Sequence, residues 1–191
     1  MPKNRDVSAI FASNRVSLLI DTSSIVRIRK FSEAIPYYAK FFDLYTLEKN
    51  KSELTFLADD PLKSSFMLSY SLELIKQIQE GNIKTLRNGA PYVAMPKSFD
   101  RKICKKFPNN ELSYTDKLLL FFTSSSKEST ILVTNDRELH DIAEELGIVS
   151  FGAYELFILM NKTEIAPKNV KELLPAIAET KNTIKMASHS Q

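Results

Sequence analysis

Two aspartates follow apolar segments that read as buried strands. Asp21 comes directly after residues 16–20 (VSLLI), and Asp136 comes shortly after residues 131–133 (ILV). Short runs of β-branched and aliphatic residues are typical of strands buried on both faces. A third aspartate, Asp116, lies 20 residues before Asp136 in the segment LSYTDKLLLFF. In open α/β sheets ligands bind at the carboxyl ends of the strands, so these three carboxylates are the first candidates for chemistry.

Each aspartate also has a structural explanation. Asp21 and Asp136 could cap the helices that follow them, because a carboxylate accepts from the free N–H groups of a first helical turn. Asp116 is the fourth residue of Ser113-Tyr-Thr-Asp116, which matches a capping box. Taken one at a time, the three residues leave capping and chemistry both open.

The three together indicate a cation site if the strands of residues 16–20 and 131–133 are neighbours. Asp21 and Asp136 would then face one crevice, and Asp116 could reach it from an adjoining helix start. Converging carboxylates repel one another unless a cation lies between them. Oxygen ligands of this kind select Mg²⁺ or Mn²⁺, and such metals can generate a hydroxide that attacks phosphorus.

The rest of the chain predicts the elements that position these residues. Further strands are expected at residues 53–58 (ELTFLA), 91–96 (PYVAMP) and 148–151. Helices are expected at 25–49, broken near Pro36, and at 64–80, 99–107, 112–122, 139–146, 154–160 and 169–179, the last interrupted at Pro175, with a frayed tail from 181. Strands alternating with helices predict an α/β fold with a mainly parallel sheet covered on both faces.

Three segments resemble the best-marked motifs of PIN-domain ribonucleases. They are LLIDTSS (18–24), ELSYTDKLLL (111–120) and ILVTNDRELHDIA (131–143), and the resemblance spans roughly residues 16–152. It implies a Rossmann-like three-layer α/β/α sandwich and a metal-dependent endonuclease that acts on RNA. We accordingly expect an N-terminal arm (1–15), a PIN-like nuclease domain (16–160), and a C-terminal helix with its tail (161–191).

The same resemblance assigns roles to site residues. The three aspartates would bind Mg²⁺ or Mn²⁺ and act in catalysis. The residues that would support them are Thr22 and Thr134, through their hydroxyls, and Glu138, as an extra acid.

The sequence departs from the family at its second acid, a glutamate in the helix after the second strand. With ELTFLA as that strand, the position falls near Ser64 or Ser65, which cannot replace a carboxylate. Asp59 is favoured as the substitute metal ligand, with Asp60 and Glu73 as the other choices, and all three could also be surface residues. The gap favours one alternative to an active enzyme: a degenerate PIN-like module that binds RNA or protein without cutting. Another is the toxin of a toxin–antitoxin pair.

Basic residues supply a candidate RNA-binding surface. The net charge is only +3, but lysines and arginines gather in two stretches. We expect Arg27 from one stretch and Lys97, Arg101 and Lys102 from the other to neutralise phosphates. For either stretch taken alone, a solvated helix face is the more common explanation.

Composition bears on the cellular compartment and on the partners to be expected. The one cysteine, Cys104, excludes an intramolecular disulfide framework and favours a reducing cytoplasm. No apolar run is long enough to span a membrane, and we recognise no signal peptide. RNA is the expected partner. A homodimer is another, because residues 154–160 (YELFILM) are apolar enough for an interface, and an antitoxin or other protein is a third.

Overall fold

The computed structural model describes residues 11, 15–22, 26, 29–60, 62, 65–86, 95–161 and 167–188. Arg27 and most of the strand expected at 91–96 lie outside these residues. Within the described part, the chain alternates between short strands and helices, and the strands form one sheet.

All five strands of the sheet are parallel, in the order β3-β2-β1-β4-β5. The strands are β1 (Ser17–Ile20), β2 (Asp43–Leu47), β3 (Lys84–Leu86), β4 (Thr130–Val133) and β5 (Ser150–Phe151). The register pairs Ile20 of β1 with Val133 of β4, so these two central strands end side by side. The expected adjacency of the strands that precede Asp21 and Asp136 is confirmed.

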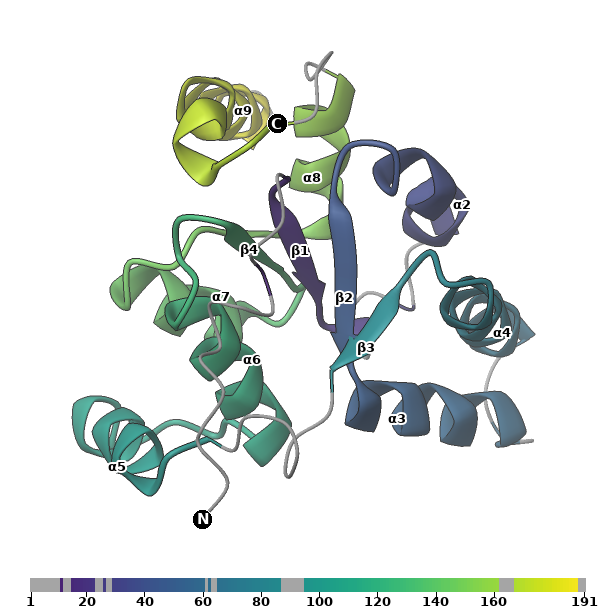
Figure 1. The fold of residues 1–191 in the computed structure, drawn as a ribbon, viewed down its shortest axis with the longest axis horizontal. Coiled ribbons are helices and arrows are strands. Elements are labelled where there is room, and N and C mark those ends of the chain that lie inside the picture. The colour runs from purple at the N-terminus through teal and green to yellow at the C-terminus, as the bar shows by residue number, and fades with distance from the viewer. Residues whose placement is uncertain are drawn as a thin grey trace.

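Helices cover both faces of this sheet (Figure 1). They are α2 (Arg29–Tyr38), α3 (Glu48–Asp59), α4 (Ser65–Gln79), α5 (Lys97–Lys106), α6 (Tyr114–Ser124), α7 (Arg137–Glu145), α8 (Ala153–Asn161) and α9 (Val170–Ser188). Helices α2, α4, α8 and α9 contribute to the core on one face, and α5, α6 and α7 contribute to the core on the other. The predicted α/β fold, a Rossmann-like three-layer sandwich, is confirmed.

Residue alternation along the central strand builds the two cores. Leu18 and Ile20 pack into one core and Leu19 into the other, and all three side chains are 0% exposed. Successive side chains of a strand point to opposite faces, so a strand buried on both sides must be apolar throughout. This is why VSLLI and ILV could be recognised from sequence.

The prediction of a strand at residues 53–58 was wrong, because this segment lies in helix α3. Leu54, Thr55 and Phe56 alternate in the manner of a strand, yet Leu54 is fully buried while Phe56 is 69% exposed. The second strand is instead β2, within the segment assigned to a helix. Its Thr46 hydroxyl donates a 2.8 Å hydrogen bond to the Ile20 carbonyl, which satisfies a polar group at a strand position that the apolar pattern did not reveal.

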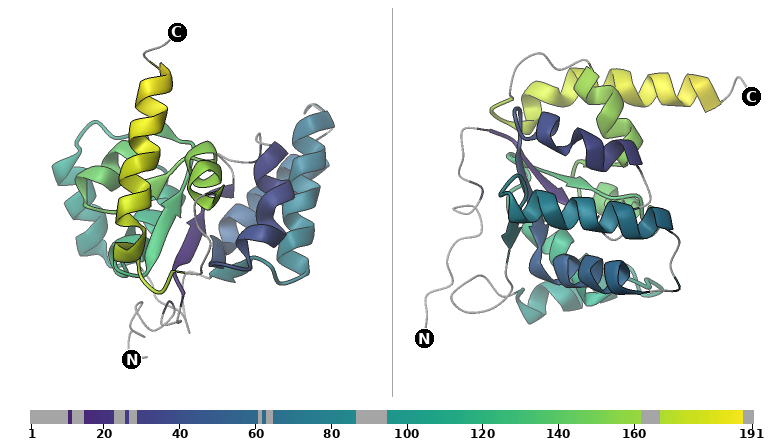
Figure 2. Two further views of the ribbon diagram at one scale, coloured as in Figure 1. Left: turned by 90° about the horizontal axis from the view of Figure 1, so that it is seen from above. Right: turned by 90° about the vertical axis from the view of Figure 1, so that its right-hand side faces the viewer.

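The segment expected to form the third strand, 91–96, lies mostly outside the described residues, within which the third strand is β3, a strand that was not expected. The expectation for the last helix was corrected. Helix α9 continues through Pro175 to Ser188, where an interruption and a frayed tail were expected; Figure 2 shows its C-terminal part extending past the body of the molecule. Leu173 and Ile177, on either side of Pro175, are buried in the core, and this packing stabilises the helix across the proline.

The apolar segment at 154–160 forms helix α8, and most of its large side chains are used inside the protein. Leu156, Leu159 and Met160 are at most 1% exposed, while Tyr154 is 66% exposed. The apolar content that suggested a dimer interface is therefore largely core. Among the described residues, no helix is long and apolar enough to cross a membrane.

A pair of leucine substitutions measures how much the central strand contributes to stability. We expect Leu18→Ala to lower the free energy of unfolding by about 2–5 kcal/mol, because it leaves a cavity where the native side chain is fully buried. Leu72→Ala, at a position that is 51% exposed, should change it by less than about 1 kcal/mol. Urea denaturation of both variants measures the difference, and equal losses would contradict the assignment of Leu18 to the core.

Candidate functional site

The candidate site lies where the chain reverses its direction across the sheet. From β1 the chain proceeds to β2 and β3 on one side, and it returns to β4 and β5 on the other. The carboxyl ends of β1 and β4 flank this switch point, which is where α/β sheets bind ligands. Asp21 follows β1 directly, and Thr134 follows β4 directly.

Thr134 connects the two strand ends. Its hydroxyl donates a 2.8 Å hydrogen bond to the Asp21 carboxylate and accepts a 3.0 Å hydrogen bond from the Asp136 backbone N–H. Asp21 is 2% exposed and Thr134 is 1% exposed. The Asp21 backbone N–H also donates to the Val133 carbonyl at 2.9 Å. The bonds hold Asp21 in place relative to the segment that carries Asp136.

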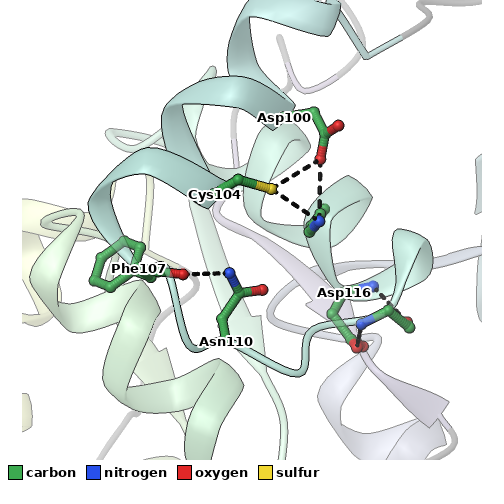
Figure 3. Close-up of polar contacts among 7 residues, drawn as sticks. Asp100, Cys104, Phe107, Asn110 and Asp116 are labelled. Carbon is green, nitrogen blue, oxygen red and sulfur yellow. Dashed lines mark hydrogen bonds and ion pairs between the residues drawn. The ribbon is translucent and has the colours of Figure 1, made fainter.

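Asp136 and Asp116 both cap helices, as the structural explanation of each residue proposed. One Asp136 oxygen accepts from the Leu139 N–H at 2.9 Å at the start of α7. One Asp116 oxygen accepts from the Ser113 N–H at 2.7 Å, and the Ser113 hydroxyl accepts from the Asp116 N–H, which completes a capping box (Figure 3). Each cap uses one carboxylate oxygen, so capping does not prevent the other oxygen from binding a ligand.

A fourth carboxylate, Glu53 of α3, belongs to the same group. Burial raises the pKa of Glu53, Lys49 opposes this, and the negative charges of Asp21 and Asp116 raise it further. Burial likewise raises the pKa of Asp116; its bonds to Ser113 oppose this, and the charges of Asp21 and Asp136 add to it. The four carboxylates therefore interact electrostatically, although they come from four separate parts of the chain.

Sequence reasoning missed Glu53 because it assigned the residue to a strand. With β2 at Asp43–Leu47, the helix after the second strand is α3, and Glu53 is its sixth residue. The acid that the resemblance implies in the helix after the second strand was therefore sought one helix too late. The spacing Asn50, Glu53, Leu54, Leu57 follows one helical face, and this pattern could have revealed the helix.

The structure does not bring the proposed substitutes to the site. Asp59 ends α3 and is exposed, about 9 Å along the helix axis from Glu53. Asp60 accepts a hydrogen bond from the Leu62 N–H, and Glu73 of α4 accepts one from Gln77.

Glu138 also has a structural task. Its carboxylate accepts a 2.9 Å hydrogen bond from the Glu111 backbone N–H, which connects the first turn of α7 to the segment before α6. This segment carries Ser113, the cap residue of α6. Glu138 thus helps to hold the helix starts of Asp116 and Asp136 together.

Some of the buried polar atoms without partners belong to residues close in sequence to the acids. The Thr22 and Thr115 hydroxyls, which neighbour Asp21 and Asp116 in sequence, have no hydrogen-bond partner among the described residues. The same is true of both amide atoms of Asn50, one helical turn before Glu53, and Asn50 is 0% exposed. Buried polar atoms are almost always satisfied, so an unpartnered group beside a candidate acid fits a position that takes up water or a ligand.

In their present positions, no three His, Cys, Asp or Glu side chains of the described residues could hold a metal ion together. The acids are close enough to repel one another but do not converge on one point. Binding of a cation would therefore require their side chains to move closer together.

The basic helix α5 packs against α6 near this group. Lys97, Arg101 and Lys102 are exposed on it. The Lys117 ammonium, next to Asp116 in sequence, turns away to Asp100 of α5 at 3.1 Å and to the Cys104 sulfur at 3.5 Å (Figure 3). The bond to Asp100 raises the pKa of Lys117. This lysine is therefore engaged by α5 and is not paired with Asp116.

Comparisons with known proteins support the fold. No family model and no curated protein matches this sequence. Among solved structures, the chain is similar to the crystal structure of PAE2754 from Pyrobaculum aerophilum, with a TM-score of 0.53 and 16% sequence identity. The match covers 85% of this chain and 99% of that one. At this level of identity the similarity shows the shared fold alone.

Replacement of Glu53 by Gln tests the electrostatic coupling without any ligand. A raised pKa means that the folded protein holds this proton more tightly than the unfolded chain. The protonated carboxyl therefore contributes fully to the free energy of unfolding at pH values below the pKa of Glu53 in the unfolded chain. This contribution is lost as the pH rises through the pKa of Glu53 in the folded protein. We therefore expect Glu53→Gln, relative to wild type, to gain stability as pH increases from about 4 to about 7.

The measurement is the free energy of unfolding across this pH range with a chelator present. Glu80→Gln is the matched control, because Glu80 lies on the surface of the molecule, where it pairs with Lys76 at 3.8 Å. The electrostatic grouping is contradicted if both variants show the same dependence on pH.

Proposed function

We propose that this protein is a divalent-metal-dependent endoribonuclease whose site is formed by Asp21, Glu53, Asp116 and Asp136. The observation that carries this proposal is the electrostatic grouping of four carboxylates at the switch point of a parallel sheet. Like charges that are held together and partly buried destabilise the protein unless a cation is bound. Such a group of carboxylates would therefore be compatible with a stable fold when a cation is bound between them.

The donor set is one that Mg²⁺ or Mn²⁺ would accept, because all four groups are carboxylates. When bound, such a metal activates water and stabilises charge at phosphorus. Asp21 would be the least mobile ligand, since Thr134 fixes one of its oxygens. Asp116 and Asp136 would each contribute the oxygen that their helix caps leave unused, and Glu53 would approach from α3.

RNA is the proposed substrate, and α5 is its proposed docking surface. Lys97 and Arg101 lie four residues apart on this helix, so both can face solvent on one side, with Lys102 beside them. Their charge suits a polyanion, and α5 packs next to the helix that carries Asp116. The single cysteine favours action in a reducing compartment such as the cytoplasm.

The alternative function, an RNA- or protein-binding PIN-like module without activity, rests on a different observation. Among the described residues, no group of acids is arranged to hold a metal at present. If the side chains cannot converge, the site would remain an acidic surface that binds no cation. Titration with Mn²⁺ followed by calorimetry separates the two proposals, since saturable binding that Glu53→Gln weakens is expected only of the enzyme.

Substitutions at the acids test the proposed activity. We expect Asp136→Asn to abolish cleavage of single-stranded RNA in Mn²⁺ while leaving the protein folded, because asparagine caps a helix as well as aspartate. Glu53→Gln should lower cleavage by about a hundredfold or more. The assay is the initial rate on a labelled oligonucleotide, with circular dichroism to verify folding.

Asp59→Asn is the matched control for Glu53→Gln, because both residues lie on α3 and only Glu53 interacts with the other acids. It should retain the wild-type rate. If Asp59→Asn lost activity and Glu53→Gln kept it, the assignment of the fourth ligand would be wrong. Full activity of Asp136→Asn would contradict the proposed site as a whole.

The role of α5 can be tested through the salt dependence of binding. We expect the triple variant Lys97→Gln, Arg101→Gln, Lys102→Gln to reduce the slope of log K against log salt by about 2, since each phosphate contact on a single strand contributes about 0.7. Fluorescence anisotropy with labelled RNA in a chelator measures the slope. Lys168→Gln with Lys171→Gln, near the start of α9, should leave the slope unchanged. Equal effects of the two sets would indicate general attraction by net charge, not a docking surface.

A further inference from the structure

A pocket of about 580 Å³ lies beside the candidate site, between the α5–α6 loop and α7. Phe107 and Asn109 line it from the loop, and Arg137 and Asp141 line it from α7. Arg137 follows Asp136 directly in the chain, so one end of the pocket adjoins a candidate metal ligand. The acids themselves do not line this pocket, and the proposed cleavage chemistry does not use it.

The loop that forms one wall is held by its own hydrogen bonds. The side-chain amide and the backbone N–H of Asn110 both donate to the Phe107 carbonyl, and Figure 3 shows the Asn110 side chain turned toward it. The bond from the Glu111 N–H to Glu138 connects the same loop to α7. Because this loop is already fixed, it loses little conformational entropy when a ligand binds.

The two cations of the pocket pair with acids of α7, and its third charged side chain on that helix, Glu138, accepts a hydrogen bond from the Glu111 N–H. The Lys106 ammonium lies 3.0 Å from the Glu145 carbonyl oxygen and 3.8 Å from its carboxylate. The Arg137 guanidinium lies 3.9 Å from the Asp141 carboxylate. With its cations balanced by acids of α7, the pocket suits a neutral part of a ligand better than a phosphate.

The Phe107 ring supplies a flat apolar surface in this pocket. Phe107 is half-buried, it packs against the core on this side of the sheet, and the Lys106 ammonium lies 5.0 Å from its ring centroid. A planar ligand would stack on the part of the ring that lines the pocket. The exposed side chains of Asn109 and Arg137 can donate hydrogen bonds to the edge of such a ligand. A flat, neutral group with polar edges is the description of a nucleobase.

We propose that this pocket binds a base of single-stranded RNA, from a nucleotide next to the one whose phosphate reaches the acids. The proposal rests on the proposed function for the identity of the ligand. The lining residue Ile142 lies six residues after Asp136, about 9 Å along α7, which places the pocket close to the site but not in it. Because stacking accepts every base, the pocket would contribute affinity and only a modest sequence preference.

A tryptophan reporter tests the pocket without any catalytic step. The sequence contains no tryptophan, so Phe107→Trp introduces a single tryptophan at the stacking position, and its emission can be excited selectively over that of the tyrosines. With a chelator present, we expect a short oligoadenylate to quench its emission saturably, and an abasic strand of the same length to leave it unchanged. Tyr154→Trp on α8 is the control reporter, because its side chain is exposed and lies outside the pocket, and it should not respond to either strand.

Affinity measurements keep the proposal testable if the tryptophan variant folds poorly. By anisotropy in a chelator, Phe107→Ala should bind single-stranded RNA about tenfold more weakly than wild type, while Phe107→Tyr should bind as wild type. The proposal is overturned if both strands quench the emission of the Phe107→Trp variant equally or not at all, or if Phe107→Ala binds RNA with unchanged affinity.

These outcomes are independent of the proposed activity. Saturable quenching by a protein that never cleaves RNA would support the pocket and contradict the enzyme. Cleavage that depends on Asp136, without a response of the tryptophan reporter in the pocket, would support the enzyme and contradict the pocket.

Discussion

The parallel pairing of β1 with β4 is the constraint on which the candidate site depends. It brings Asp21 and the segment of Thr134 and Asp136 together across more than a hundred residues of chain. Two hydrogen bonds to the Thr134 hydroxyl then fix Asp21 and the backbone of Asp136 relative to each other. Because both strands are buried on both faces, neither can shift without disturbing both cores.

Helix caps help to stabilise carboxylates that lie close together in the folded protein. Burial, and to a smaller extent the charges of the other acids, raise the pKa of Asp116 and of Glu53, so each charged carboxylate destabilises the fold. At Asp116 and Asp136, hydrogen bonds from N–H groups at a helix start oppose this destabilisation, because negative charge is favoured there. Capping and ligand binding, which the sequence left as alternatives, are thus compatible at the same residue.

The parts of the fold that could be predicted are those with an unambiguous hydrophobic period. β1 and β4 each end in three consecutive apolar residues, and α7 places its apolar residues at helical spacing up to Gly147, whose φ of 68° ends the helix. β2 and α3 could not be assigned, because β2 carries Asp43 and Thr46, and α3 exposes Phe56. The local pattern favoured the wrong period in both places, and tertiary packing determined the result.

This error had a direct effect on the site. The three aspartates could be found because each lies beside an element with a clear pattern. Glu53 could not, since its helix was read as a strand and the helix after that strand was searched instead. The basic helix α5 was predicted correctly, but its relation to Asp116 depends on how α5 packs against α6, and this is not visible in the local sequence.

The nearby lysines explain why the acidic group keeps its negative charge. Lys117 follows Asp116 in the chain, yet its ammonium pairs with Asp100 and contacts Cys104. Lys49 lowers the pKa of Glu53, but burial and the other acids outweigh it. Four carboxylates with one opposing lysine retain a net negative charge, and a single monovalent side chain cannot neutralise them. A divalent cation would offset more of this charge than an ammonium on a long side chain, because it would bring two charges instead of one to a point between several oxygens.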